Sequence, residues 1–304
     1  MEQFQKAELH LHLEGSLEPE TIRELSPATS LDEIEQRYNF TGFLGFIDAF
    51  KWVAGFLNTP EDYALATRRL LESLHRQNVV YAELTLAAGV ALWRKLDFAA
   101  IYQAVVREAA LSPVEVRWVL DCIRHFGPEH GMDVARLAVE RAGDGVVAFG
   151  IGGDEARGPA RWFKDVVAFT RDHGLRFVPH AGETTDAQSI WEAVELGADR
   201  IGHGIRAIDD PRLVQYLKDR DIPLEISITS NVSTGAVASL ADHPVRKLYE
   251  LGVPIILNTD DPAIFHTTLD NEYRIAADQF GFTEDQLRNL AADSLQRGIF
   301  TLAK

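Results

Sequence analysis

The sequence predicts an α/β protein with a (β/α)8 TIM barrel and an extra helical insertion after the first strand. Within its 304 residues, short segments rich in Val, Ile and Leu alternate eight times with helix-like stretches, the pattern of this barrel in chains of about 250 residues or more. The eight predicted strands are residues 6–13, 79–86, 115–123, 145–153, 176–183, 200–204, 222–230 and 253–260. A doubly wound sheet is the competing fold, but its glycine fingerprint would end here in Glu155 instead of glycine.

The predicted helices carry recognisable start and stop signals. Thr59 is followed by Pro60 and two acidic residues, which is typical of a helix N-terminus. Residues 159–173 form an amphipathic stretch that stops at a glycine. Thr283 and Gln286 have the spacing of a capping box, so we expect them to begin the last helix.

The connection between the first two predicted strands is too long for a plain barrel, at about 65 residues. Residues 42–57 within it are unusually aromatic, with Phe43, Phe46, Phe50, Trp52 and Phe56. Two compatible interpretations are an extra helix packed on the barrel and a lid that lines an apolar pocket. We therefore expect a lid-like insertion over about residues 15–60 of a single domain that spans residues 1–304.

Composition excludes several classes of partner. The formal net charge is −16 with neutral histidine, and such a surface repels phosphate backbones, so we expect no nucleic-acid partner. No apolar run approaches the roughly 18 residues of a spanning helix, so we expect no membrane contact. Cys122 is the only cysteine, which excludes an internal disulfide and a multi-cysteine zinc site. With no secretion-signal pattern at the N-terminus, these features point to the cytoplasm, while a homo-oligomer stays open.

Histidines and a carboxylate stand at the predicted C-terminal ends of three strands. His10 and His12 alternate on the first strand, so both point into the barrel mouth. His180 lies on the fifth strand and Asp260 ends the last one, and these ends meet at the face where barrel enzymes build their sites. Three imidazoles and one carboxylate suit one zinc-type divalent cation with a water that completes the shell. Segment 145–155 has no lysine to bridge a second metal, which favours a mononuclear site.

Three further polar residues stand beside the predicted ligands. Glu183 lies three residues beyond His180, where it can protonate the group under attack. His203 lies between two glycines and can approach the metal-bound water as an electrostatic or proton-handling group. Asp261 follows a ligand, so we expect it to face the substrate. Because a bound metal makes hydroxide available near neutral pH, the residues predict metal-assisted hydrolysis.

Six motifs follow one another along residues 10–265. They are HLHLEGSL (10–17), GIGGDE (150–155), VPHAGE (178–183), RIGHGI (200–205), TSNVSTGA (229–236) and LNTDDPAIF (257–265). Together they closely resemble the motifs of the adenosine deaminase family, in the amidohydrolase superfamily. The resemblance implies a (β/α)8 barrel, one zinc ion per chain and hydrolytic removal of the 6-amino group of an adenine ring as ammonia.

The resemblance also implies a role for each site residue. The implied zinc ligands are His10, His12, His180 and Asp260. Glu183 is similar to the acid that protonates purine N1, so that C6 accepts the attacking hydroxide. His203 resembles the residue that orients or deprotonates the zinc-bound water together with Asp260. Asp261 resembles the group that hydrogen-bonds N7, and the backbone N–H of Gly153 resembles the donor to N3.

Glu14 leaves the purine substrate open. Family members that act on adenosine typically have Asp at this position, where it reaches the ribose, whereas glutamate resembles the branch that includes adenine deaminases. The segment 229–236 is more similar to that of the nucleoside-using members. The implied substrates are therefore adenosine, aminodeoxyfutalosine (an adenine nucleoside of menaquinone synthesis) and free adenine, with Glu14 as a candidate sugar-side contact. Two other functions are alternatives to purine deamination: a mononuclear amidohydrolase that acts on a different ring amine, and a non-catalytic relative that binds a nucleoside.

Overall fold

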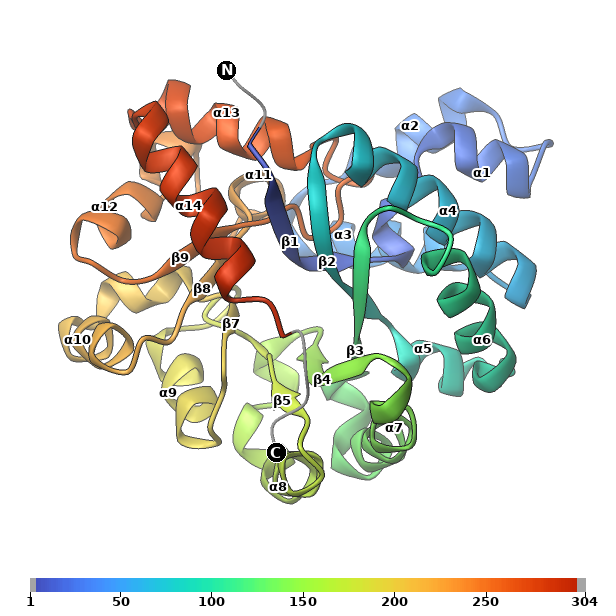
Figure 1. The fold of residues 1–304 in the computed structure, drawn as a ribbon, viewed down its shortest axis with the longest axis horizontal. Coiled ribbons are helices and arrows are strands. Elements are labelled where there is room, and N and C mark those ends of the chain that lie inside the picture. The colour runs from blue at the N-terminus through green and yellow to red at the C-terminus, as the bar shows by residue number, and fades with distance from the viewer. Residues whose placement is uncertain (1–3, 300–304) are drawn as a thin grey trace.

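The computed structural model describes residues 4–299, and its strands form a ring with helices around it (Figure 1). The strands are β1 Lys6–His12, β2 Val79–Leu86, β3 Glu115–Ile123, β4 Val146–Gly152, β5 Arg176–Phe177, β6 His180–Ala181, β7 Ile201–His203, β8 Leu224–Ile226 and β9 Ile255–Leu257. All their pairings are parallel. β1 and β4 are buried at every residue, as expected for strands that face a packed barrel interior on one side and helices on the other.

The ring consists of two hydrogen-bonded runs, β1 to β5 and β6 to β9. They meet within the predicted fifth strand, residues 176–183, which Pro179 interrupts because proline has no N–H for the ladder. The chain still spans the gap: the Val178 N–H donates to the Phe149 carbonyl at 3.1 Å, and the Gly202 N–H donates to the Pro179 carbonyl at 2.9 Å. One predicted strand is therefore two short ones.

The ring closes between β1 and the residues that follow β9. The Asp260 N–H donates to the His10 carbonyl at 3.0 Å, and the His12 N–H donates to the Asp260 carbonyl at 2.8 Å. Closure therefore uses three residues that the sequence predicts as metal ligands. The predicted (β/α)8 barrel is confirmed.

Helices connect the strands and cover the outside of the ring (Figure 1). They are α1 Pro19–Leu25, α2 Leu31–Tyr38, α3 Gly42–Ala54, α4 Pro60–Arg76, α5 Ala88–Trp93, α6 Phe98–Ala109, α7 Gly127–Glu140, α8 Lys164–Asp172, α9 Ala187–Glu195, α10 Pro211–Asp219, α11 Ile228–Ser233, α12 Val245–Glu250, α13 Leu269–Phe280 and α14 Glu284–Gln296. Thr59 caps α4 by accepting from the Asp62 N–H, and Thr283 caps α14 by accepting from the Gln286 N–H, which confirms both predicted starts. Among the residues that the structure describes, no helix has the length and apolar character needed to cross a membrane.

The predicted insertion after the first strand contains α1, α2 and α3. Its aromatic stretch forms α3, whose Phe46 ring stacks on Phe265 with centroids 5.0 Å apart. Phe50 meets His12 edge to face, with centroids 6.4 Å apart. Arg94 holds the end of α3, donating to the Ala54 carbonyl at 2.6 Å. These contacts place α3 beside the carboxyl end of β1.

The predicted seventh strand, residues 222–230, is wrong over its last residues. β8 ends at Ile226 and α11 begins at Ile228. The buried carboxylate of Glu272 lies at the start of this helix, where it accepts hydrogen bonds from the N–H groups of Ile228 at 2.9 Å and Thr229 at 3.2 Å. These are the free donors of a helix N-terminus, which a carboxylate stabilises.

Candidate active site

Four predicted metal ligands converge at the carboxyl ends of the strands. Nε2 of His10 lies 3.2 Å from Oδ1 of Asp260, and Nε2 of His12 lies 3.4 Å from the same oxygen. Nε2 of His12 also lies 3.2 Å from Nε2 of His180. All four residues are at most 9% exposed. The ligand atoms of His10, His180 and Asp260 form a compact group with a nitrogen of His203, all within 4.8 Å of one another.

The outer hydrogen bonds of two of these rings test whether the cluster fits a metal. Nδ1 of His10 lies 2.8 Å from Oε2 of Glu225, and Nδ1 of His180 lies 3.2 Å from the Ile151 carbonyl. Both partners are acceptors, so the neutral rings carry their proton on Nδ1 and aim a lone pair from Nε2 into the cluster. Metal-binding histidines show this arrangement. Nε2 of His10 faces a carboxylate oxygen of Asp260 at 3.2 Å, a contact that is favourable with either a proton or a cation between the two atoms.

The pKa shifts of the three histidines also suit a bound cation. Burial lowers the pKa of His12 to about 4 and lowers the pKa of His180 well below its usual value, so both rings are neutral and able to bind a cation. Burial opposes charge on His10 as well, but hydrogen bonds to Asp260 and Glu225 raise its pKa above the usual value. The position between His10 and Asp260 therefore favours positive charge, and the donor set suits a divalent metal.

Asp260 is held in an unusual backbone conformation. Its φ is +68°, and that of His203 is +62°, a region that side-chain-bearing residues rarely adopt. Ser230 donates to Oδ2 of Asp260 at 2.8 Å, which leaves Oδ1 turned toward the histidines. Such strained residues cluster at functional sites and persist where the surrounding structure holds them.

Glu183 lies on a loop whose backbone N–H groups are hydrogen-bonded to the carboxylate of Glu155. The N–H groups of Gly182, Glu183 and Thr184 all donate to the side chain of Glu155 at 2.8 Å. Oε2 of Glu183 reaches to 3.7 Å from Nε2 of His203. Burial, with repulsion from two nearby carboxylates, raises the pKa of Glu183 well above its usual value. This shift favours the protonated form of Glu183, whose carboxyl group faces the same point as His203.

The other predicted site residues surround this point. Asp261 is 1% exposed, its Oδ1 has no hydrogen-bond partner among the described residues, and burial raises its pKa well above the usual value. Oε1 of Glu14 accepts from the Ala87 N–H at 3.1 Å, Oε2 lacks a partner within residues 4–299, and burial raises its pKa to about 7. Gly153 has a φ of +91° and lies beside His125: a Cβ there would be 3.3 Å from the ring Nδ1. Asp261 and Glu14 thus have free polar atoms for a ligand.

Gly15 is required by the position of Asp261. A Cβ at Gly15 would lie 1.6 Å from Oδ1 and 2.4 Å from Cγ of Asp261, far inside van der Waals contact. The glycine in the HLHLEGSL segment thus makes room for a substrate-facing carboxylate, a role that sequence reasoning did not assign.

Sequence reasoning also missed a buried chain of charges behind His10. Glu225 uses its second oxygen, Oε1, to accept from Nε of Arg200 at 2.5 Å, and Arg200 forms an ion pair with Glu83 through Nη2. Burial opposes charge on Glu225, but Arg200 lowers its pKa below the usual value. A charged residue inside the apolar strand β8 is the signal that could have revealed it.

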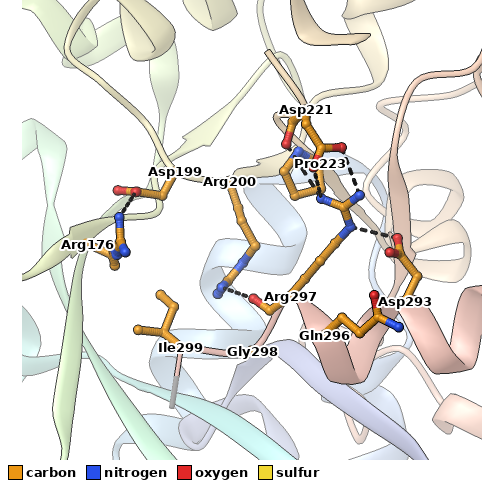
Figure 2. Close-up of a pocket in the computed structure, with 10 residues that line it drawn as sticks. All are labelled: Arg176, Asp199, Arg200, Asp221, Pro223, Asp293, Gln296, Arg297, Gly298 and Ile299. Carbon is orange, nitrogen blue, oxygen red and sulfur yellow. Dashed lines mark hydrogen bonds and ion pairs between the residues drawn. The ribbon is translucent and has the colours of Figure 1, made fainter. Parts of the chain in front are cut away.

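Arg200 also lines a pocket of about 500 Å³ at the N-terminal ends of the strands, opposite the candidate active site. Figure 2 shows Nη1 of Arg200 donating to the Arg297 carbonyl, at 3.1 Å, and a separate ion pair between Arg176 and Asp199. The arginines drawn there all have partners, so this pocket offers no unpaired cation to a ligand. Of its side chains, Arg200 is the one that contacts Glu225, the hydrogen-bond partner of His10.

Comparisons with known proteins agree with this geometry. The sequence profile described as adenosine deaminase matches residues 5–302. The chain is 38% identical to the aminodeoxyfutalosine deaminase of Streptomyces coelicolor, over 96% of this chain and 79% of that one. It is 32% identical to an adenine deaminase of Rhizobium leguminosarum bv. trifolii, over 96% and 94%. A crystal structure of adenine deaminase from Arthrobacter aurescens superposes with a TM-score of 0.91 at 28% identity, over 97% and 94%. The chain therefore belongs to the adenosine deaminase family and is a hydrolase of purine C–N bonds.

Proposed function

We propose that this chain is a mononuclear zinc enzyme that deaminates a 6-aminopurine nucleoside, with aminodeoxyfutalosine as its leading substrate. The observation that carries the proposal is the cluster of His10, His12, His180 and Asp260, with two of its rings anchored so that Nε2 points inward. The Streptomyces coelicolor relative supports aminodeoxyfutalosine over adenosine. Free adenine is the second candidate, supported by the Rhizobium relative and the Arthrobacter structure.

Glu183 is the proposed proton donor. Burial raises its pKa and so favours the protonated carboxyl group, and transfer of that proton to N1 of the purine makes C6 electrophilic. His10, His12, His180 and Asp260 would hold the metal, which would supply an activated water as the nucleophile. His203, 3.7 Å from Glu183, faces the same point and interacts with the attacking oxygen. These interactions strengthen as charge develops in the transition state, where binding accelerates the reaction.

The remaining residues are proposed to bind the substrate. Asp261 hydrogen-bonds N7 and the Gly153 N–H donates to N3, which together fix the purine edge. Burial raises the pKa of Asp261, and its protonated form would donate to the lone pair of N7. Glu14 is proposed to contact the sugar through Oε2, which lacks a partner among the described residues.

Helix α3 is the proposed lid. Phe50 is the part of α3 in ring contact with His12, so it shields the site from water, which strengthens the electrostatic interactions inside. We expect Phe50→Ala to raise KM. The matched control is Leu44→Ala, on the same helix but 73% exposed. Equal KM values for the two variants would contradict the lid.

The central experiment measures ammonia release by zinc-loaded protein that is offered aminodeoxyfutalosine, adenosine and adenine in parallel. We expect the highest kcat/KM with aminodeoxyfutalosine. Faster turnover of adenine would make the second candidate the function, and no ammonia from any of the three would refute purine deamination.

Two variants test the residue roles. Glu183→Gln should keep its metal but lose nearly all turnover, because an amide cannot supply the proton; activity equal to that of Glu129→Gln, an exposed change on α7, would refute the acid. Asp260→Ala should lose the metal, measured by elemental analysis of the purified protein. A fully loaded and active Asp260→Ala protein would refute its role as a ligand.

A further inference from the structure

His243 is a buried histidine outside the proposed reaction, and its hydrogen bonds define its tautomer. It is 5% exposed, and the Val245 N–H donates to its Nδ1 at 3.1 Å. A backbone N–H can only donate, so Nδ1 is an acceptor and the proton of the neutral ring lies on Nε2. Burial lowers the pKa of His243 to about 3, so the ring is neutral under physiological conditions.

The orientation of Asn231 follows from that tautomer. Nε2 of His243 donates to Oδ1 of Asn231 at 3.1 Å, and Nδ2 of Asn231 lies 3.0 Å from Nδ1 of His203. If the amide were turned around, its NH2 group would face the donor N–H of His243. The amide therefore presents a donor to His203, whose Nδ1 must accept.

The same logic gives the tautomer of His203. With Nδ1 occupied as an acceptor, the neutral ring carries its proton on Nε2. That atom lies 3.7 Å from Oε2 of Glu183 and 3.9 Å from Oδ2 of Asp260, facing the candidate active site. An unprotonated Nε2 is what a proton-accepting histidine would need there, and this hydrogen-bond chain opposes it.

We propose that Asn231 and His243 are positioning residues that keep the proton of His203 on Nε2, so that His203 enters the reaction as a hydrogen-bond donor rather than as a proton acceptor. The proposal deepens the proposed function and rests on it for the kinetic arm of its test. The hydrogen bonds run from a helical N–H of α12 through three side chains to the reacting centre.

The tautomer is measured directly by NMR. Zinc-loaded protein labelled with ¹⁵N in its histidine rings gives long-range proton–nitrogen correlations that distinguish a protonated from an unprotonated ring nitrogen. We expect His203 to show a protonated Nε2 and an unprotonated Nδ1, with its signals assigned by their loss in His203→Gln. The reverse pattern overturns the proposal. This readout needs no turnover, so it stays decisive even if purine deamination fails.

Kinetics of the positioning residues give the second arm. His243→Phe removes the donor to Asn231 and should lower kcat roughly 10- to 100-fold with little change in KM, since misplacing one group in a preorganised site costs about this much. His243→Gln should restore most of kcat, because its amide donates from the position of Nε2. Asn231→Asp places an acceptor against Nδ1 of His203 and should move the proton to Nδ1 and alter the pH profile of kcat.

A matched control separates this effect from general destabilisation. His130 is a half-buried histidine that bonds the Gly89 carbonyl through Nε2 at 2.9 Å, away from the cluster, and His130→Phe should leave kcat and the His203 signals unchanged. If His243→Phe behaves like this control, with an unchanged His203 tautomer and an unchanged kcat, His243 is structural only and the proposal is wrong.

Discussion

Replacing Glu155 with glutamine tests how the loop that carries Glu183 is held. The Glu155 carboxylate is 3% exposed and accepts from three successive backbone N–H groups, with Thr185 as a further donor at 2.9 Å. Burial opposes its charge, but Arg124 and these hydrogen bonds lower its pKa from 4.5 to about 2. A shift of this size corresponds to about 3 kcal/mol of folding free energy.

The amide of Glu155→Gln offers one acceptor oxygen in place of two and turns an NH2 group toward a backbone donor. We expect a loss of about 3 kcal/mol in the free energy of unfolding, measured by urea denaturation at pH 7, and a fall in kcat because Glu183 moves with the loop. The matched control is Glu192→Gln, a carboxylate with a more exposed partner in Arg161. Equal stability losses in the two variants would refute the reasoning.

The sign of the pH dependence follows from the lowered pKa. Because the folded state holds the Glu155 proton less tightly than the unfolded state, the stabilisation is fully present above pH about 4.5 and is lost as pH falls toward 2. Unfolding experiments across this window should show a steeper loss of stability in the wild type than in Glu155→Gln. Parallel curves would show that the lowered pKa does not stabilise the fold.

Three further outcomes are expected. Arg200→Met should weaken zinc binding roughly 10- to 100-fold in a chelator competition, because Arg200 holds the carboxylate of Glu225 that anchors His10. The control is Arg176→Met, in the same pocket. Equal zinc affinities of the two variants would contradict a role of Arg200 in metal binding. Gly15→Ala should lower kcat/KM roughly 10- to 100-fold by displacing Asp261, at unchanged zinc content, whereas Gly143→Ala, where a Cβ meets nothing within 4 Å, should be neutral. Removing zinc with a chelator should lower the thermal midpoint, since metal at about 100 times its Kd contributes about 2.7 kcal/mol; an unmoved midpoint would show that the folded state holds no metal.

The strands could be predicted from the sequence because each carries a compact apolar run that a barrel interior demands. Two strand boundaries could not be predicted. One depends on a residue that is distant in the sequence, and the other depends on a proline that removes a hydrogen-bond donor from the sheet. Residues 228–230 turn into helix α11 under Glu272, which lies more than forty residues away. Pro179 divides the fifth strand, and its consequence depends on which neighbours the flanking residues pair with.

The predicted site residues could be found because the strand ends collect them at one face. The partners of their supporting residues could not be predicted, since each of these residues acts across the barrel. Glu225 meets His10 only once β1 and β8 lie inside the same ring. Nothing in the sequence distinguishes His243 from an ordinary core or surface histidine, and its link to the site is visible only in its hydrogen bond to Asn231.

Asp260 joins the two ends of the barrel ring through its backbone and faces the histidines through its side chain. Its main-chain hydrogen bonds to His10 and His12 are therefore the point where the first and last strands separate if the ring opens. A metal held by His10, His12 and Asp260 would pull together side chains on both sides of that line. We therefore expect the amide protons of His12 and Asp260 to exchange with solvent more slowly in the metal-loaded protein. Their exchange rates would then report on both the occupancy of the site and the closure of the ring.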